Sequence, residues 1–475
     1  MRISFFLILL LLCFPFATAD DLPNLGDVSQ SAMSPLEESK LGEQIMLDIH
    51  QDPTFFDDPE VTEYLNSLGY RLVSASPDNT LDFHFFTIRD NTLNAFALPG
   101  GYIGVHTGLI IAAQSESELA SVLAHEIGHV VQHHLARMLA RQQQNTLPTL
   151  AALAVAVLAA RSNPQVSQAA MATAQAASVQ TQLDFTREHE READRVGLQI
   201  LSKAGFDTRA IPAFFERLQR ASRLYENNAP AYLRTHPLTS ERIADIENRV
   251  AEMPYKQVRD SLDFQLVRAK LRALLSSPAQ AVKEFESNLQ DKRYASEAAQ
   301  HYGLALALMR AKAFDRAETE IAALRKITPP NAIVDTLSAD LKMAQGKTDA
   351  AIAQYRSSLR LYPNHRALVY GLGNALLETG RLAEAEKFVR SRLNGNFSQD
   401  SRLYELQAKI YAAEGKPMLS HQSQAEAYVR LGNLTAAIEQ LQIALKYGSG
   451  DFYQQSIVEA RLKELRRTND PKRKP

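Results

Sequence analysis

The stretch that decides the fold is His125-Glu126-Ile127-Gly128-His129, an HExxH motif inside a segment with helical periodicity. On a helix, residues i and i+4 lie on the same face, with Cβ atoms about 5–6 Å apart. His125 and His129 can therefore present two imidazole nitrogens to one Zn²⁺ ion, which binds His nitrogens at about 2.0–2.1 Å. Glu126 lies beside them, where its carboxylate can accept a proton from water at the metal. The motif predicts a zinc-dependent peptidase.

The residues around the motif favour a single long helix. Ser115 followed by Glu118 is a capping-box pattern, which starts helices, and apolar residues recur at helical spacing from there through the motif. Basic residues toward Arg141 suit the C-terminal end of this helix. The longer zinc motif that continues with Gly and His is absent. We therefore interpret His133 and His134 as ordinary helix residues.

A third metal ligand must come from elsewhere, and the carboxylate-rich segment from Phe185 to Gly197 is the best candidate. Glu190 and Asp194 share one face of the helix expected there, and Glu188 and Glu192 share another. One pair would supply a carboxylate ligand and a second carboxylate that orients a ligand histidine. Alternatively, the segment is a solvated run of charges. Spacing alone leaves the choice between the two faces open.

The two motifs together resemble the gluzincin family, which includes the CAAX prenyl endopeptidase and the bacterial heat-shock membrane peptidase. The resemblance implies one Zn²⁺ per chain, with Glu190 as the third ligand and Asp194 as its supporting carboxylate. The stretch from Asn94 to Ile103 also resembles this family's Asn-Ala-Phe-Ala plus Gly-Gly strand, which implies an edge strand that pairs with extended substrate. On its residues alone, this stretch is a hairpin turned at Pro99-Gly100-Gly101.

A further histidine occurs in Thr235-His236-Pro237. The same family has a similar segment near its active cleft, so the resemblance implies a site role for His236. This side chain would stabilise the tetrahedral intermediate, or it would fill the position that catalytic zinc keeps open for water and hold the enzyme latent. The alternative is an ordinary loop histidine before a proline.

The first nineteen residues have the pattern of a secretory signal. Arg2 supplies the positive charge, an apolar run follows, and Ala17-Thr18-Ala19 is a cleavage site, so cleavage is expected after Ala19. Cys13 is the only cysteine, and the leucine before it argues against lipidation. The mature chain is therefore expected to be exported and to contain no disulfide.

Composition limits the other functions of the chain. Its 52 Lys and Arg residues nearly balance 54 Asp and Glu residues, so nucleic acid is not an expected partner. No second run of about 18 apolar residues occurs, which predicts a soluble mature chain. The segment 150–160 is nevertheless apolar all round. It is interpreted as a buried hairpin helix or, alternatively, as an interfacial or substrate-gating helix with peripheral membrane contact.

The C-terminal part repeats with a period of 34 residues, which is visible in three sets of positions: Ala317, Ala351 and Ala385; Gly346 and Gly380; Pro329 and Pro363. This period indicates tetratricopeptide repeats, helix pairs in which Gly opens the turn and Pro follows the second helix. The clearest units are 335–364 and 366–393, followed by 403–416 and 425–447 with slipped spacing and a capping helix at 457–467. Such arrays form curved solenoids that bind peptides or proteins. A scaffold that only stabilises the protease is the alternative.

We therefore expect a signal peptide (1–19), a zinc metallopeptidase domain (20–260) and a tetratricopeptide domain (261–475). The fold class is mainly α with a small β-sheet in an α+β gluzincin domain, followed by an all-α solenoid. This order resembles the family of proteases that enhance β-barrel assembly in Gram-negative bacteria. The resemblance implies a periplasmic zinc endopeptidase and chaperone that promotes outer-membrane β-barrel assembly and degrades misassembled precursors.

The same resemblance implies two kinds of partner, namely unfolded or misassembled outer-membrane proteins and, through the repeats, the β-barrel assembly machinery. One alternative is a latent or non-proteolytic chaperone or adaptor that acts through its repeats. Retention of Glu126 argues against it, because a structural zinc site needs no general base. A processing peptidase with a single cleavage site in one exported protein is a third interpretation.

Overall fold

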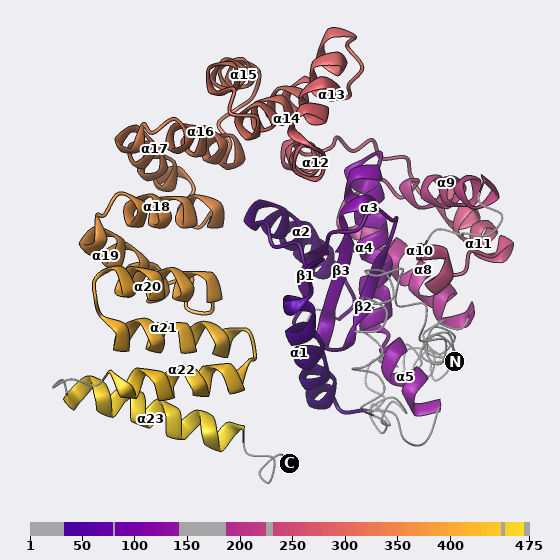
Figure 1. Ribbon diagram of the computed structural model, residues 1–475. Helices are drawn as coiled ribbons and strands as arrows, with labels where there is room; N and C mark the ends of the chain where they lie inside the picture. Colours follow the sequence, from indigo (N-terminus) through magenta and orange to yellow (C-terminus); the bar gives the residue numbers. More distant parts are fainter. Residues whose placement is uncertain (1–32, 79–80, 142–186, 225–230, 448–451, 470–475) are drawn as a thin grey trace, which may run out of the picture.

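The computed structural model describes residues 33–78, 81–141, 187–224, 231–447 and 452–469 (Figure 1). The expected signal peptide and the apolar segment 150–160 lie outside these ranges. A small sheet with surrounding helices is followed by an array of helices that curves past it (Figure 1). The expected fold class, mainly α with a small sheet and then an all-α solenoid, is confirmed. No helix within the described ranges is both long and apolar enough to cross a bilayer.

The N-terminal part holds one sheet and most of the helices around it. Its elements are α1 (Pro35–Gln51), α2 (Pro59–Val73), β1 (His84–Ile88), β2 (Ala95–Leu98), the 3₁₀ turn η1 (Pro99–Gly101), β3 (Tyr102–His106), α3 (Thr107–Ala112), α4 (Glu116–Val131), α5 (His134–Arg141), α8 (Arg187–Lys203), α9 (Ala210–Leu224), α10 (Ala231–Thr235) and α11 (Ser240–Ala251).

The sheet has the strand order β1-β3-β2. β1 pairs with β3 in parallel, and β2 pairs with β3 in antiparallel fashion, with Ala95 opposite Val105. Gly100 and Gly101 have φ angles of 73° and 80°, which glycine adopts without strain, and they turn the chain between β2 and β3. The expected hairpin is therefore present, and β2 is its outer strand within the described residues.

Helix α4 begins as its sequence predicts but ends earlier. The Ser115 hydroxyl accepts a hydrogen bond from the backbone N–H of Glu118 at 3.2 Å, and α4 is buried along its whole length. The expected continuous helix is wrong beyond Val131, because His133 has a φ angle of 50° and breaks it. A left-handed residue ends a helix, so His134 starts the separate helix α5.

Two glycines let α8 pack closely across α4. A Cβ atom on Gly128 of α4 would lie 2.9 Å from the carbonyl oxygen of Ala193, and one on Gly197 of α8 would lie 3.1 Å from the backbone of His125. Any larger side chain would push the helices apart. This close crossing brings the HExxH motif beside the carboxylates of α8.

The C-terminal part consists of paired helices. They are α12 (Leu262–Leu275), α13 (Pro278–Gln290), α14 (Glu297–Arg310), α15 (Phe314–Ile327), α16 (Ala332–Ala344), α17 (Thr348–Leu361), α18 (Arg366–Glu378), α19 (Leu382–Leu393), α20 (Ser401–Ala413), α21 (Pro417–Arg430), α22 (Leu434–Lys446) and α23 (Phe452–Thr468). The repeating alanines at 317, 351 and 385 are fully buried where helices meet. Gly346 and Gly380 have φ angles of 74° and 71° at the turns inside each pair, as the repeat pattern predicts.

The helical array contacts the N-terminal part through α2. Lys270 of α12 places its Nζ atom 2.7 Å from a carboxylate oxygen of Asp58, the N-cap of α2, and 2.7 Å from one of Glu60. Tyr302 of α14 donates a hydrogen bond of 3.4 Å to the same Glu60 oxygen. Apolar side chains from α2, α12, α14 and α16 share one core, which joins the two parts.

Candidate metal centre

Four buried side chains converge between α4, α8 and the loop after α10. One ligand atom from each of His125, His129, Glu190 and His236 lies within 4.8 Å of the other three. The Nε2 atoms of His125 and His129 are 3.0 Å apart, and the Glu190 carboxylate lies 3.5 and 3.4 Å from them. Nδ1 of His236 lies 3.0 Å from Oε1 of Glu190. Four of the six residues that the sequence singled out thus form one set of potential ligands.

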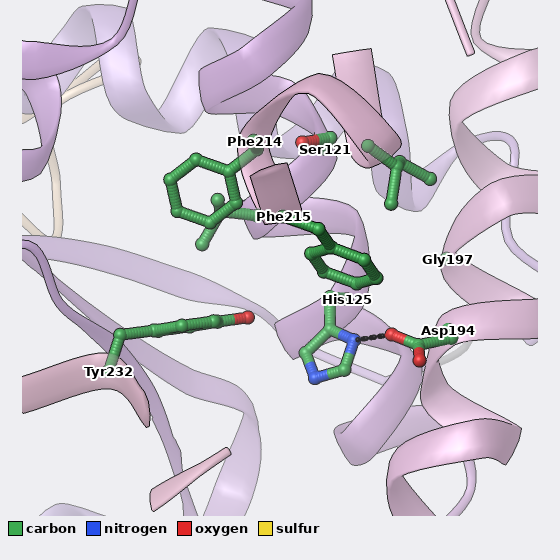
Figure 2. A pocket seen from close by; sticks show the side chains of 9 residues that line it. Ser121, His125, Asp194, Gly197, Phe214, Phe215 and Tyr232 are labelled. Carbon is green, nitrogen blue, oxygen red and sulfur yellow. Dashed lines mark ion pairs between the residues drawn. The ribbon is translucent and has the colours of Figure 1, made fainter. Parts of the chain in front are cut away.

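Asp194 sets the orientation of His125. Its Oδ1 atom lies 2.9 Å from Nδ1 of His125, and Figure 2 shows this contact as a dashed line. An ionised carboxylate only accepts hydrogen bonds, so Nδ1 of His125 carries the proton that Asp194 accepts, and Nε2 is the atom left to bind a metal. Phe214, Phe215 and Tyr232 line the pocket beside the His125 ring (Figure 2).

The donor set fits a metal ion. Nε2 of His125, the His129 ring and the Glu190 carboxylate point at one another in a site closed to bulk water. Two imidazole nitrogens and one carboxylate oxygen are ligands that divalent transition metals prefer. A cation among them would make three attractive contacts with these ligand atoms.

Electrostatics keep the carboxylates ionised although they are buried. Burial raises the pKa of Glu190, but the charge of His236 and hydrogen bonds from His125 and His129 outweigh it and hold the pKa well below its usual value. Burial likewise raises the pKa of Asp194, and hydrogen bonds from Arg242 and His125 reverse the shift. Anionic oxygens therefore face the centre.

The two motif histidines differ in their affinity for protons. Burial lowers the pKa of His129 to about 3, because the Glu190 carboxylate compensates only in part. Burial also lowers the pKa of His125, but hydrogen bonds to Asp194 and Glu190 outweigh it and raise the pKa to about 10. Without a metal, His125 therefore carries a second proton on Nε2 near neutral pH, and a bound cation would displace this proton.

Glu126 lies next to this cluster with its side chain fully buried. Burial raises its pKa, while the charges of His236 and His125 oppose the shift. Its Oε1 atom lies 3.5 Å from Nε2 of His236. A raised pKa makes a carboxylate a stronger base, as a general base in catalysis requires.

The structure distinguishes between the two faces of α8. Glu190 and Asp194 are buried toward α4, whereas Glu188 is exposed. Glu192 is partly exposed, but its carboxylate turns back and reaches His134 at 3.0 Å. The face of α8 that carries Glu188 and Glu192 is therefore not simply a run of solvent-exposed charges.

Sequence reasoning missed Arg242 at this site. Its side chain is 2% exposed and pairs with Asp194 through two hydrogen bonds and with Glu190 at 2.6 Å. Its Nη1 atom also donates a hydrogen bond of 2.8 Å to the carbonyl oxygen of Pro237. The only signal was an arginine six residues after His236, at the start of the last helix of this part, which is too common a feature to be informative.

Comparison with known proteins agrees with this geometry. Residues 59–250 match Peptidase family M48, and residues 342–410 match a tetratricopeptide repeat family. The chain is similar to the "Beta-barrel assembly-enhancing protease" of Escherichia coli O157:H7, with 35% identity over 460 residues that cover 95% of this chain and 93% of that protein. It is 34% identical to the "Putative beta-barrel assembly-enhancing protease" of Vibrio cholerae, covering 90% of this chain and 92% of that protein.

A further relative matches a smaller share of the chain. The "Mitochondrial metalloendopeptidase OMA1" of Schizosaccharomyces pombe is 34% identical over 199 residues, which cover 41% of this chain and 55% of that protein. The match to a peptidase family and the buried cluster of histidines and carboxylates agree on a metal-dependent enzyme. The chain belongs to the family of β-barrel assembly-enhancing proteases, metalloendopeptidases of the M48 type that also carry tetratricopeptide repeats.

Proposed function

We propose that this chain is a periplasmic zinc-dependent endopeptidase and chaperone that promotes the assembly of outer-membrane β-barrel proteins and degrades misassembled precursors. The observation that carries the peptidase is the convergence of His125, His129 and Glu190 beside the buried carboxylate of Glu126. The names of its relatives from Escherichia coli and Vibrio cholerae support the role in β-barrel assembly.

Peptide hydrolysis follows from these positions. His125, His129 and Glu190 would hold one Zn²⁺, with Asp194 fixing the tautomer of His125. When bound, Zn²⁺ supplies a Lewis acid that activates water for attack on a peptide carbonyl. Glu126 accepts the proton of the attacking water on its carboxylate and then delivers it to the leaving amine. The raised pKa of Glu126 supports the acceptance of this proton.

His236 has two candidate roles. It would stabilise the charge on the tetrahedral intermediate, or it would serve as a fourth ligand that keeps the enzyme latent. Its Nδ1 atom lies 3.0 Å from Glu190, within the cluster of potential ligand atoms, which supports the fourth-ligand role. Because catalytic zinc needs one open position, activity would then require His236 to move away.

Extended substrate would pair with β2. This strand is the outer strand of the described sheet and contacts α4, which carries Glu126. An outer strand presents unpaired backbone groups that can bind an extended peptide. Unfolded or misassembled outer-membrane proteins could supply such a segment, whereas a folded barrel has no free edge.

The repeats would act as the docking part. We propose a metallopeptidase domain at 20–260 after a signal peptide cleaved behind Ala19, and a tetratricopeptide domain at 261–475 that binds the β-barrel assembly machinery. Stacked repeats form extended concave surfaces suited to protein partners. Peripheral membrane contact by segment 150–160 also stays a proposal.

The test combines metal content with proteolytic activity. We expect about one zinc per chain in the mature protein and cleavage of an unfolded substrate such as casein. Glu126→Gln should retain zinc and lose cleavage, and Glu188→Gln, an exposed carboxylate on α8, is the control. Absence of zinc from the wild type would overturn the site assignment.

A second candidate is a latent or non-proteolytic adaptor, and the fourth potential ligand at His236 favours it. Outer-membrane protein assembly in cells that carry only Glu126→Gln discriminates between the two candidates. A pure adaptor keeps its full function with this variant. A protease loses the degradation of stalled precursors.

A further inference from the structure

His134 lies against the metal centre although it comes from a different helix than the HExxH motif. It is the first residue of α5, and its side chain is fully buried. Its Nδ1 atom lies 2.9 Å from Nδ1 of His129, and its Nε2 atom lies 3.0 Å from Oε2 of Glu192. The three side chains therefore form a hydrogen-bonded row that starts at a proposed metal ligand.

The break in the helix creates this contact. On a continuous helix, residues five positions apart point about 140° away from each other, given about 100° per residue. His129 and His134 would then face different sides. The left-handed conformation of His133, with φ of 50°, turns the chain so that α5 brings the His134 ring back beside His129.

Hydrogen-bond chemistry assigns the protons along the row. The Glu192 carboxylate only accepts, so Nε2 of His134 donates to it and Nδ1 of His134 is left as an acceptor. Nδ1 of His129 must then carry the proton that is donated to His134. This leaves the lone pair of His129 on Nε2, the atom that faces His125 and Glu190.

Two neighbours hold His134 in place. Its ring stacks on His189 of α8, with centroids 4.5 Å apart and an interplanar angle of 18°. Arg137, one turn later on α5, places its Nη2 atom 3.2 Å from the same Glu192 oxygen. Glu192, the hydrogen-bond acceptor at the end of this row, belongs to α8 and is also held by Arg137 of α5.

We propose that His134 is a positioning residue of the metal centre, which fixes the tautomer and ring orientation of His129 and is itself aligned by Glu192. His125 receives the same support from a carboxylate, Asp194, so the two imidazole ligands are oriented by different kinds of acceptor. This inference rests on the proposed role of His129 as a metal ligand.

The test measures metal binding by the full-length mature protein rather than cleavage alone. His134→Phe keeps an aromatic ring but removes the acceptor, and His134→Asn restores a small acceptor near Nδ1. We expect His134→Phe to raise the zinc dissociation constant by about 10- to 100-fold, the usual effect of losing such a partner, with His134→Asn in between. His133→Asn, which tolerates a positive φ, is the matched control and should bind zinc like the wild type.

A spectroscopic readout separates positioning from a general loss of stability. With Co²⁺ in place of zinc, the visible absorption band reports ligand geometry and should change in His134→Phe but not in His133→Asn. If His134→Phe does not fold, Glu192→Ala decides, with the exposed Glu188→Ala as its control. We expect weaker zinc binding for Glu192→Ala than for Glu188→Ala.

The outcomes distinguish this inference from the proposed function. Wild-type zinc affinity and an unchanged cobalt spectrum in His134→Phe, or equal affinities in the two glutamate variants, would overturn the role of His134 and leave the peptidase intact. If His129→Ala binds zinc as tightly as the wild type, the ligand assignment fails and the inference fails with it.

Discussion

The guanidinium of Arg242 and the carboxylate of Asp194 form two parallel hydrogen bonds, from Nε to Oδ2 and from Nη2 to Oδ1, each 2.7 Å long. Both side chains are 2% exposed. Asp194 also accepts from His125, and Arg242 also contacts Glu190 and the carbonyl oxygen of Pro237. One arginine therefore connects the carboxylates of α8 to the loop that carries His236.

Replacing this arginine should destabilise the protein strongly. Arg242→Gln would leave the carboxylates of Asp194 and Glu190 buried without their counter-charge, which costs about 3–5 kcal/mol of unfolding free energy. Denaturant unfolding of the metal-free protein measures this loss. Arg249→Gln removes an arginine that is 42% exposed and pairs with Asp245, so it should change stability by about 1 kcal/mol at most. Equal effects of the two substitutions would contradict the anchoring role.

Asp194→Asn should weaken metal binding without removing a proposed ligand. An amide can donate to Nδ1 of His125, which would move the ring proton to Nε2 and occupy the lone pair that faces the centre. We expect the zinc dissociation constant to rise by about 10- to 100-fold, measured by competition with a chelator. Asp245→Asn is the matched control at the surface, and unchanged affinity in Asp194→Asn would argue against the tautomer assignment.

His236→Ala separates the two roles proposed for His236. As a fourth ligand, His236 keeps most molecules inactive, so its removal should raise the rate of casein cleavage by about tenfold or more, provided that about 10% or less of the enzyme is open. As a transition-state contact, its removal should lower the turnover number. The turnover number of His236→Ala is measured at the same zinc occupancy as the wild type. An increase supports the fourth-ligand role, and a decrease supports the transition-state role. Tyr428→Ala in the repeats serves as a distant control.

Stability should fall with rising pH because of Asp340 in α16. Burial raises the pKa of this carboxyl from 3.8 to about 6, although Tyr355 donates a hydrogen bond to it. Since the folded pKa lies above the unfolded one, the folded state holds the proton more tightly. The unfolded state therefore ionises first, and stability decreases between about pH 4 and pH 6 and stays reduced above it.

Asp340→Asn should remove this pH dependence. At pH 7 the wild type holds an ionised, buried Asp340, and the pKa shift from 3.8 to about 6 lowers its unfolding free energy by about 3 kcal/mol. The variant avoids this loss, minus any weakening of its hydrogen bond to Tyr355. Denaturant unfolding of both proteins at pH 4 and pH 7 gives the comparison. Asp349→Asn, whose side chain is 81% exposed, should follow the wild type at both pH values. If Asp340→Asn is less stable than the wild type only at pH 7, the predicted effect of this carboxyl on stability is wrong.

Local patterns determined much of this protein. The spacing of His125 and His129 within one helix, the hairpin at Pro99-Gly100-Gly101 and the repeat of 34 residues could all be read from the sequence, and the structure has each of them. Their physical basis is short-range, because helix periodicity, glycine turns and small residues at helix contacts act within a few residues of the chain. The fold class followed from these elements.

Tertiary structure alone decided how the centre is completed. Spacing alone left Glu190 with Asp194 and Glu188 with Glu192 as equal choices, and only the resemblance to a known family favoured the first pair. The close crossing of α4 and α8 at Gly128 and Gly197 is what turns that pair inward. Arg242 and His134 could not be predicted from spacing. Arg242 arrives from a separate helix, and His134 reaches His129 only because the helix breaks at His133. Contacts between elements depend on packing geometry, which a periodic pattern within one element does not encode.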